Sequence, residues 1–302
     1  KCFPKPSGDV CIDGKAIRGA ARYDPKYKKS KDPSPIDMVS LWSVEQGISF
    51  GQILVSEKSN EITAIPTLLT LACLAGCIVS IDAIGCQKKI AEAVLKAKGD
   101  YLLALKDNQG SLCDAARDIF DNMQENFEQV PESKAWYHTS ISEDKGHGRI
   151  EKREVIAFGH PKDGDYFAKE MDAAKDWVGI RSFAKIQTTV TVVATGKTTS
   201  ESRYYITSLK AEEVDRIAKS IRNHWSIENQ LHWQLDVSFG EDASKRIKNA
   251  ALNMSVINKM ALSVLKKYKE TTKSRKSMKS LMKRACMSSD VLLDILEKSV
   301  WN

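Results

Sequence analysis

The chain has 302 residues, of which 42% are hydrophobic and 28% are charged, with a formal net charge of +7 at pH 7. This length and balance predict a globular protein of one large domain or two ordinary ones, and they exclude a chain too polar to build a core. The mild excess of positive charge is compatible with a polyanionic partner but does not single one out.

The seven cysteines are odd in number and include no C-x-x-C pair. They favour reduced thiols and a cytoplasmic setting over a disulfide framework or a thiolate metal site. Residues 62–80 carry no charge and approach the length of a membrane span. Because Pro66, Gly76 and several hydroxyl side chains interrupt this stretch, we expect a helix over 62–75 and a buried strand over 77–82, and neither a membrane segment nor a signal peptide.

The other elements of the first part follow in chain order. Residues 9–13 form a short predicted strand ended by Gly14, and a basic loop follows over residues 15–35. Two strands over 37–46 and 51–55, around Gly47 and Gly51, are typical of a hairpin. After the helix and strand named above, the pattern predicts a helix, a buried strand and a further helix, over residues 86–99, 100–106 and 108–124.

The pattern changes near residue 125. Four short strand-like runs separated by charged turns predict a β-rich insertion, namely AWYHTSISE, KREVIAF, FAKIQTTVTVV and SRYYITSL. Helical periodicity returns at residue 211 and again over 250–267. The segment from Lys266 to Arg284, with both ends included, contains nine Lys or Arg residues. The order of strands and helices indicates an α/β fold with a mixed sheet, divided at residues 1–124, 125–210, 211–270 and 271–302.

Two aspartates follow predicted buried strands. Asp13 ends the first strand, and Asp82 ends the run IVSID. Side chains at the ends of adjacent parallel strands converge at one edge of a sheet. Paired carboxylates there repel each other unless a cation lies between them, and Mg²⁺ prefers such hard oxygen ligands. For either residue alone, a turn or a helix cap is the simpler interpretation.

A third acid lies in the stretch IRNHWSIENQLHWQLDV (221–237). His224, Glu228 and His232 are spaced four residues apart and share one face of a predicted helix. An ionised Glu228 on this half-apolar face is costly unless it is paired or bound to metal, and a surface glutamate is the alternative. A zinc hydrolase site is disfavoured, because two histidines eight residues apart lie about 12 Å apart along a helix.

Seven stretches of the chain, which together span most of its length, resemble the DDE-type insertion-sequence transposases, specifically the H-repeat-associated branch. They occur in the order of the family: VCIDGKAIRG (10–19), KSNEITAIPTLL (58–69), IVSIDAIGCQKKIA (78–91), GDYLLALKDNQ (99–109), GHGRIEKRE (146–154), RYYITSL (203–209) and IRNHWSIENQLHWQLDVSFGEDASKRIKNAALNMSVI (221–257). The last stretch is long and specific, whereas IDGK or IDA alone would be weak.

The resemblance implies a ribonuclease-H-like mixed sheet flanked by helices, with a β-rich insertion before the helix that carries the third catalytic acid. Carried over by position, Asp13, Asp82 and Glu228 are the three catalytic acids. They would bind two Mg²⁺ ions, with Mn²⁺ as a substitute. The implied function is that of a transposase, which cuts DNA at transposon ends and transfers the freed 3′-hydroxyl to target DNA.

The implied partner is double-stranded DNA, comprising the terminal repeats and the target, bound by a homodimer in a nucleoid-associated setting without a membrane. We expect DNA contacts from basic and histidine side chains near the predicted acids and in the insertion, namely Lys15, Arg18, His147, Arg149, Arg153, Arg222, His224 and His232. A charged hairpin turn is the alternative for the group in GHGRIEKR. We expect Trp225 and Trp233 to pack in the core and fix the helix of Glu228, in preference to stacking on bases.

Two departures from related transposases are present. The Tyr-Arg-Glu-Lys signature places an Arg four residues before the glutamate and a Lys seven residues after it, where this chain has His224 and Leu235. The H-repeat branch resembles this His-Trp pattern, so the acids are still expected to be active. Family members usually have an N-terminal helical segment before the first acid, and we expect this sequence to lack it. The other alternative to an active transposase is an inactive derivative that still binds DNA.

Overall fold

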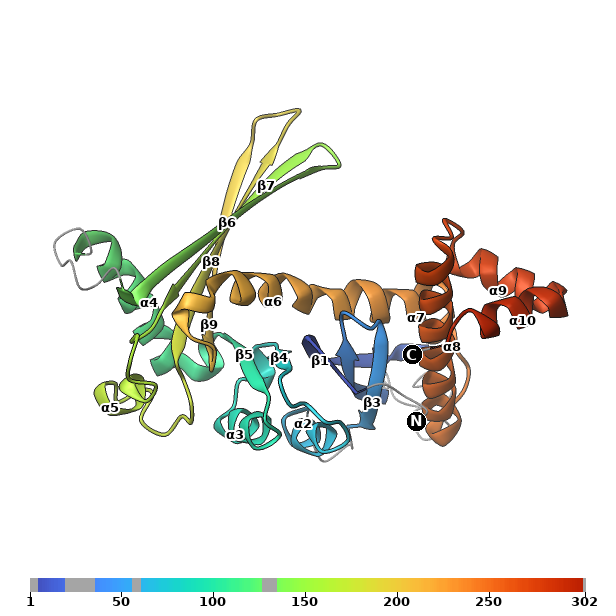
Figure 1. Cartoon of the computed structure of the whole chain (residues 1–302), viewed down its shortest axis with the longest axis horizontal. Helices are drawn as coiled ribbons and strands as arrows, with labels where there is room; N and C mark the ends of the chain where they lie inside the picture. Colours follow the sequence, from blue (N-terminus) through green and yellow to red (C-terminus); the bar gives the residue numbers. More distant parts are fainter. Residues whose placement is uncertain (1–4, 20–35, 56–60, 127–134, 301–302) are drawn as a thin grey trace, which may run out of the picture. The chain divides into compact units, whose positions relative to one another are not determined.

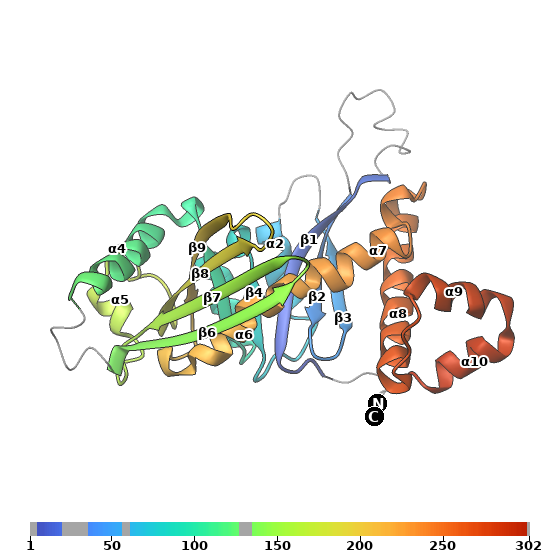
Figure 2. The same ribbon diagram turned by 90° about the horizontal axis from the view of Figure 1, so that it is seen from above.

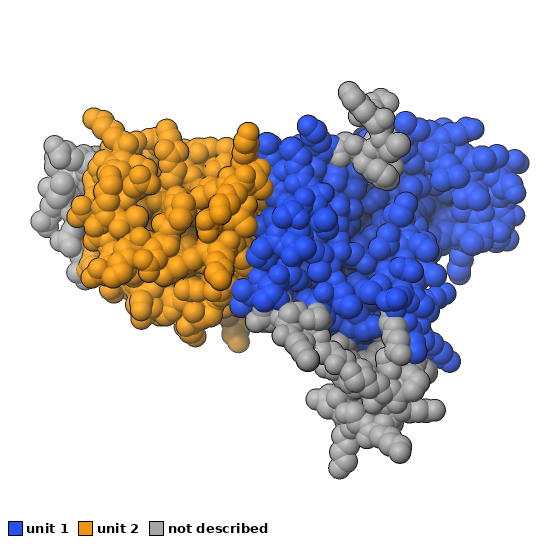
Figure 3. Space-filling model, turned by 90° about the horizontal axis from the view of Figure 1, so that it is seen from below, with its two compact units in different colours: residues 1–77, 223–302 blue, residues 78–222 orange. Residues whose placement is uncertain are grey.

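The computed structural model describes residues 5–19, 36–55, 61–126 and 135–300. The chain forms two compact units, unit 1 with residues 1–77 and 223–302 and unit 2 with residues 78–222 (Figure 3). The boundaries expected from the sequence, after residues 124, 210 and 270, differ from these. Most of the predicted basic loop, residues 20–35, lies outside the described residues.

Unit 1 contains an antiparallel sheet in the order β3-β2-β1. Its strands are β1 (Asp9–Ile17), β2 (Ile36–Ser43) and β3 (Ile48–Leu54). The turn between β2 and β3 includes Gly47 with φ of 63°, a left-handed conformation that suits glycine. The predicted hairpin is therefore confirmed.

Helices cover the sheet of unit 1 (Figures 1 and 2). Helix α2 (Glu61–Leu69) packs against β2 and β3, and α8 (Lys248–Thr272) packs against β3. Helices α9 (Met278–Met287) and α10 (Ser289–Glu297) form a pair that shares a buried cluster with α8. The predicted helix over 62–75 is shorter than expected, since α2 ends at Leu69.

Unit 2 contains a mixed sheet in the order β4-β5-β9-β8-β7-β6. Strand β4 (Ile78–Ile81) leads through the 3₁₀ turn η1 (Ala83–Gly85) and α3 (Lys88–Lys96) to the parallel strand β5 (Asp100–Leu105). The turn η2 (Asp107–Gln109) and α4 (Gly110–Asn126) follow. These elements match the predicted alternation of strands and helices.

The four strand-like runs of the predicted insertion are all strands. They are β6 (Tyr137–Gly146), β7 (Arg149–Phe158), β8 (Ser182–Val192) and β9 (Thr198–Thr207), with α5 (Tyr166–Glu170) between β7 and β8. They extend the sheet of unit 2, because β9 pairs antiparallel with β5. The far ends of both hairpins project as a long ribbon (Figure 1).

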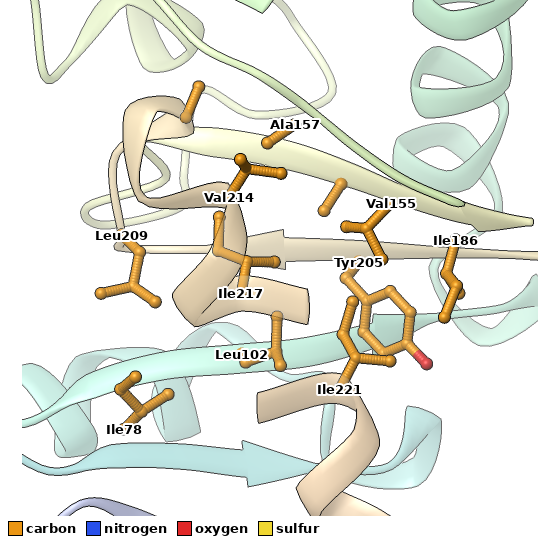
Figure 4. Packing of buried hydrophobic residues seen from close by; sticks show 12 residues of the cluster. Ile78, Leu102, Val155, Ala157, Ile186, Tyr205, Leu209, Val214, Ile217 and Ile221 are labelled. Atoms are coloured by element: carbon orange, nitrogen blue, oxygen red, sulfur yellow. The ribbon is translucent and has the colours of Figure 1, made fainter. Parts of the chain in front are cut away.

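The core of unit 2 forms where the sheet meets α6 (Val214–Ser226), which follows the turn η5 (Ala211–Glu213). Val214, Ile217 and Ile221 recur along one face of α6 and are buried against the strands (Figure 4). Their spacing of three and four residues is that of an amphipathic helix. From Asn223 onward the helix belongs to unit 1.

In unit 1 the chain continues through a π-helical segment, η6 (Ile227–His232), to α7 (Trp233–Val237) and the turn η7 (Glu241–Ala243). Segment η6 buries Ile227 and Leu231 against Cys11 of β1 and Trp42 of β2. This packing places the segment with Glu228 against the strand with Asp13. No helix in the described ranges has the length and apolar character that crossing a bilayer requires.

Candidate active site

Asp13 lies in the middle of β1, where it pairs with Ser40 of β2. The expectation that Gly14 ends this strand is wrong, because β1 continues to Ile17 and Gly14 pairs with Val39. A Cβ at Gly14 would collide with the carboxylate of Glu61 in α2. The glycine therefore marks a close approach between side chain and backbone inside a strand.

Glu228 is exposed and lies in the π-helical segment η6. The backbone N–H of Trp233 bonds to the carbonyl of Glu228, five residues back. Such a segment accommodates one residue more than an α-helical turn and is often found at functional sites. It was not predicted, because the four-residue spacing of the polar side chains in the sequence is also that of an ordinary helix face.

The expectation that Trp225 and Trp233 pack in the core is wrong. Their side chains are 44% and 54% exposed. The buried positions of this stretch are Ile227, Leu231 and Leu235, at an unbroken spacing of four residues that the π segment permits. The buried tryptophan that contacts them is Trp42 of β2.

His232 joins Asp13 to the helix of Glu228. Its Nδ1 lies 3.4 Å from Oδ2 of Asp13, one turn beyond Glu228. Burial, reinforced by the charges of Lys259 and Lys15, lowers the pKa of His232 to about 3. The imidazole is therefore neutral at physiological pH, and its Nε2 is buried without a hydrogen bond in the described structure.

Lys15 lies two residues beyond Asp13, and its side chain is only 7% exposed. Its Nζ is 2.7 Å from Asp236, 3.4 Å from Glu241 and 3.5 Å from Asp242. Burial alone would lower the pKa of this lysine, but the hydrogen bond to Asp236 and the three negative charges outweigh it and raise the pKa. The structure thus places Lys15, which the sequence predicted to meet DNA, among internal carboxylates.

Lys259 of α8 is a second buried lysine on the sheet of unit 1. Its Nζ donates to Oγ of Ser40 at 2.7 Å and also to the side-chain carbonyl of Gln52. Ser40 pairs with both Gln52 and Asp13, so the three side chains lie in a row on one face of the sheet. Burial lowers the pKa of Lys259 to about 8.

Asp82 follows β4 directly and caps η1, where Oδ1 accepts a hydrogen bond from the N–H of Gly85 at 3.4 Å. Two side chains from η2, the turn that follows β5, hold η1 in place. Asn108 donates to the carbonyl of Ala83 at 2.6 Å, and Gln109 donates to the carbonyl of Cys86 at 2.9 Å. The stretch GDYLLALKDNQ therefore supports the turn of Asp82, a role that the sequence pattern did not reveal.

The basic group in GHGRIEKR lies on the β6–β7 hairpin. His147, with φ of 49°, and Gly148, with φ of 73°, form its two-residue turn, and Arg149 follows at the exposed tip. Positive φ at both central residues is typical of a type I′ turn. The structure thus contains the charged hairpin turn that was the alternative interpretation of this stretch. Because the tip of the hairpin is exposed, its side chains are also accessible to DNA.

Arg153 and Arg222 both bind the carboxylate of Asp144. Their hydrogen bonds, that of Arg153 first, hold the pKa of Asp144 below its usual range. Because Arg222 lies on α6 and Asp144 on β6, the pair ties the hairpin to the helix within unit 2. Arg18 is exposed and His224 is half-buried, so both remain candidates for contact with DNA.

The donor set of the predicted acids consists of carboxylate oxygens, which suits Mg²⁺ or Mn²⁺ better than zinc. Asp13 and Glu228 belong to unit 1, and Asp82 belongs to unit 2. Within the part of the chain that the structure describes, no group of three or more His, Cys, Asp or Glu side chains is arranged to hold a metal ion. The described cysteines are free, with Cys11, Cys77, Cys86 and Cys113 buried.

A family model described as "Transposase DDE domain" matches residues 4–265. The chain belongs to the DDE transposase family. Its H-repeat-associated relatives include "H repeat-associated putative transposase YhhI" of Escherichia coli K12, which is 36% identical over 99% of this chain and 74% of the relative. "Putative transposase YncI" of Escherichia coli O157:H7 is 36% identical over 98% of this chain and 72% of the relative.

Among solved structures, a piggyBac transposase synaptic complex with hairpin DNA aligns with this DDE transposase chain at a TM-score of 0.49 and 10% identity. The alignment covers 97% of this chain and 54% of that one, so the chain spans about half the length of the solved protein. The family assignment rests on the sequence relatives. It carries the general expectation of divalent metal ions and DNA.

Proposed function

We propose that this DDE transposase cleaves phosphodiester bonds at transposon ends and transfers the freed 3′-hydroxyl to target DNA. The observation that carries the proposal is the contact between Asp13 and His232 at 3.4 Å. It brings strand β1 to the helix turn next to Glu228, although the two acids are far apart in the sequence. A metal-dependent nuclease requires carboxylates that lie close together, and this contact supports the proposal because it holds Asp13 beside the helical turn that follows Glu228.

Asp13, Asp82 and Glu228 would hold two Mg²⁺ ions, for which Mn²⁺ can substitute. When bound, the ions would lower the pKa of a water nucleophile and neutralise charge on the attacked phosphate. The residues of this chain position those ligands. His232 contacts Asp13, the capped turn η1 orients Asp82, and the π segment presents Glu228 to solvent.

The element order supports a ribonuclease-H-like core. Three antiparallel strands are followed by the parallel pair β4 and β5 with α3 between them, as the family resemblance implies. On this interpretation the strands β6 to β9 are the β-rich insertion before the helix of Glu228. Strand β9 pairs with β5, so the proposed insertion continues the sheet of unit 2.

Double-stranded DNA is the proposed partner, bound by a homodimer. The exposed tip of the β6–β7 hairpin, with His147 and Arg149, and the exposed Arg18 are the proposed phosphate contacts. The lysine-rich surface of α8 and α9 adds positive charge in unit 1. Arg153 and Arg222 would serve by fixing the hairpin to α6 through Asp144.

A cleavage assay tests this function. The substrate is DNA that carries both flanks of the chain's own coding sequence, and the reaction is run with Mg²⁺, with Mn²⁺ or with EDTA. We expect new 3′-hydroxyl ends and joined products with either metal ion, and none with EDTA or with Asp82→Asn. DNA binding without cleavage in every condition would instead favour an inactive DNA-binding derivative, and equal cleavage by Asp82→Asn would contradict the proposed site.

A further inference from the structure

Lys15 links the strand of Asp13 to the segment that follows Glu228. Residues 13 and 15 point to the same face of β1, because alternate residues of a strand share a face. The three carboxylates around Lys15 come from α7 and η7, with Asp236 in the first and Glu241 and Asp242 in the second. The backbone N–H of Arg18 also bonds to Asp242, at 3.3 Å.

This cluster is internal. The side chains of Lys15 and Glu241 are 7% and 3% exposed, whereas those of Asp236 and Asp242 are about one-third exposed. Neither carboxylate oxygen of Glu241 has a hydrogen bond in the described structure, and the ammonium group of Lys15 lies 3.4 Å from it as a counter-charge. A charge buried this deeply is stable only while its counter-charge stays in place.

We propose that Lys15 is a positioning residue, which clamps β1 to the α7–η7 segment and thereby fixes Asp13 relative to Glu228. The catalytic roles of Asp13 and Glu228 rest on the proposed function, whereas the ion pairs of the clamp do not depend on it. Asp13 is two residues before Lys15, and Glu228 lies eight residues before Asp236 through η6 and α7. The clamp holds this loop at Asp236, four residues beyond His232, whose side chain contacts Asp13.

The clamp also assigns roles to the acids near Glu228. Asp236, Glu241 and Asp242 each form an ion pair with Lys15, which assigns them the role of partners of the lysine. The burial of Lys15 separates this role from contact with DNA, since an ammonium group with 7% exposure has little surface to offer a phosphate. Supporting groups of this kind commonly change metal affinity by tenfold or more when they are removed.

The first test measures unfolding of the whole chain without metal or DNA, for Lys15→Met, Glu241→Gln and the double variant. Lys15→Met should lower the midpoint temperature by roughly 5 to 10 °C, because it leaves the buried carboxylate of Glu241 without its counter-charge. The double variant should lose less than the sum of the single losses. Lys89→Met, at an exposed lysine of α3, is the matched control and should leave the midpoint unchanged.

The second test measures how Mn²⁺ alone raises the midpoint temperature. Lys15→Met should need about tenfold more Mn²⁺ than the wild type to reach half of the full increase in midpoint temperature. Lys15→Arg, which keeps the charge, should need nearly as little Mn²⁺ as the wild type. If Lys15→Met does not fold, Lys15→Arg and Asp242→Asn carry the same comparison. Asp242→Asn should need more Mn²⁺ than wild type and less than Lys15→Met.

The outcomes are distinguishable. An unchanged midpoint for Lys15→Met, together with weaker binding of DNA in EDTA, would overturn the clamp and return Lys15 to a DNA-contacting role. Additive losses in the double variant would also overturn it. A wild-type chain without any response to Mn²⁺ would count against the proposed metal site, whereas the unfolding measurements would still decide whether the clamp exists.

Discussion

Trp225 and Trp233 flank Glu228 and are 44% and 54% exposed. Aromatic side chains of this size usually pack in a core, so the sequence alone predicts that both tryptophans are buried and fix the helix of Glu228. The structure instead buries aliphatic side chains on the other face of the segment. The stability of unit 1 should therefore depend on these aliphatic residues and on Trp42, and little on the exposed pair.

We expect Trp225→Ala and Trp233→Ala each to reduce the free energy of unfolding by less than about 1 kcal/mol, as for most exposed positions. Leu231→Ala, which removes a fully buried side chain from the same segment, should cost about 2–5 kcal/mol. Chemical denaturation of the three variants measures the difference. A loss at Trp233 as large as that at Leu231 would contradict the exposed placement.

The buried Lys259 predicts a pH dependence of stability. Burial lowers its pKa from 10.5 to about 8 in the folded chain, with smaller effects from Glu241 and Lys15. Between these two values the unfolded chain binds more protons than the folded one, so stability from this residue rises with pH from about 8 towards 10.5. Below pH 8 the lysine is charged in both states, and the full cost of burying the charge is present.

The comparison with Lys259→Met isolates this effect from other titrations. The unfolding free energy of the wild type, relative to the variant, should increase between pH 8 and pH 10 and stay level between pH 6 and pH 7.5. Denaturation at each pH provides the values. A difference that is flat across the whole range would show that Lys259 titrates normally in the folded chain.

Residue types and spacing could identify the candidate acids, but not their supporting groups. Asp13 and Asp82 stand out because each follows an apolar run, and Glu228 because of its polar face. Nothing local connects Lys15 with Glu241, or Lys259 with Ser40, since these pairs are more than 200 residues apart. Side-chain contacts at such separations are set by the tertiary fold, so a single sequence does not reveal them.

At the level of elements, strands and helices with a clear period were predictable, and irregular features were not. The four strands after residue 136 and the pair of β4 and β5 match the sequence pattern. Strand β1 runs past Gly14 because its pairing with β2 continues to Ile17, which local propensity does not report. The π segment was hidden because its buried spacing of four residues also fits an α-helix.

The β6–β7 hairpin supports a prediction at this level. Arg149→Ala at its tip should weaken binding to double-stranded DNA and reduce the slope of log affinity against log salt by about one, as for one lost phosphate contact. Binding is measured in EDTA, so that cleavage does not interfere. Lys175→Ala, at an exposed lysine elsewhere in unit 2, is the control, and equal effects of the two substitutions would argue against a role for the hairpin.

For the whole molecule, the two compact units do not follow one another along the chain, because unit 1 combines two separate segments. Unit 1 joins both ends of the chain, so Asp13 and Glu228 fold together although unit 2 lies between them in sequence. The family assignment was available from the sequence, because long specific stretches carry it, and the relatives confirm it. The division into units depends on which strands and helices pack together, and that emerges only in the fold.

Asp13, Asp82 and Glu228 are proposed to act together in one metal site. The most direct measurement is the rate of Mg²⁺-dependent cleavage by Asp13→Asn, Asp82→Asn, Glu228→Gln and the triple variant, with Asp118→Asn on the exposed face of α4 as control. We predict that each single change lowers the rate about as far as the triple change, at least roughly 1,000-fold, because such groups are strongly non-additive. Losses that accumulate from one substitution to the next, or a single variant that retains its rate, would contradict the account.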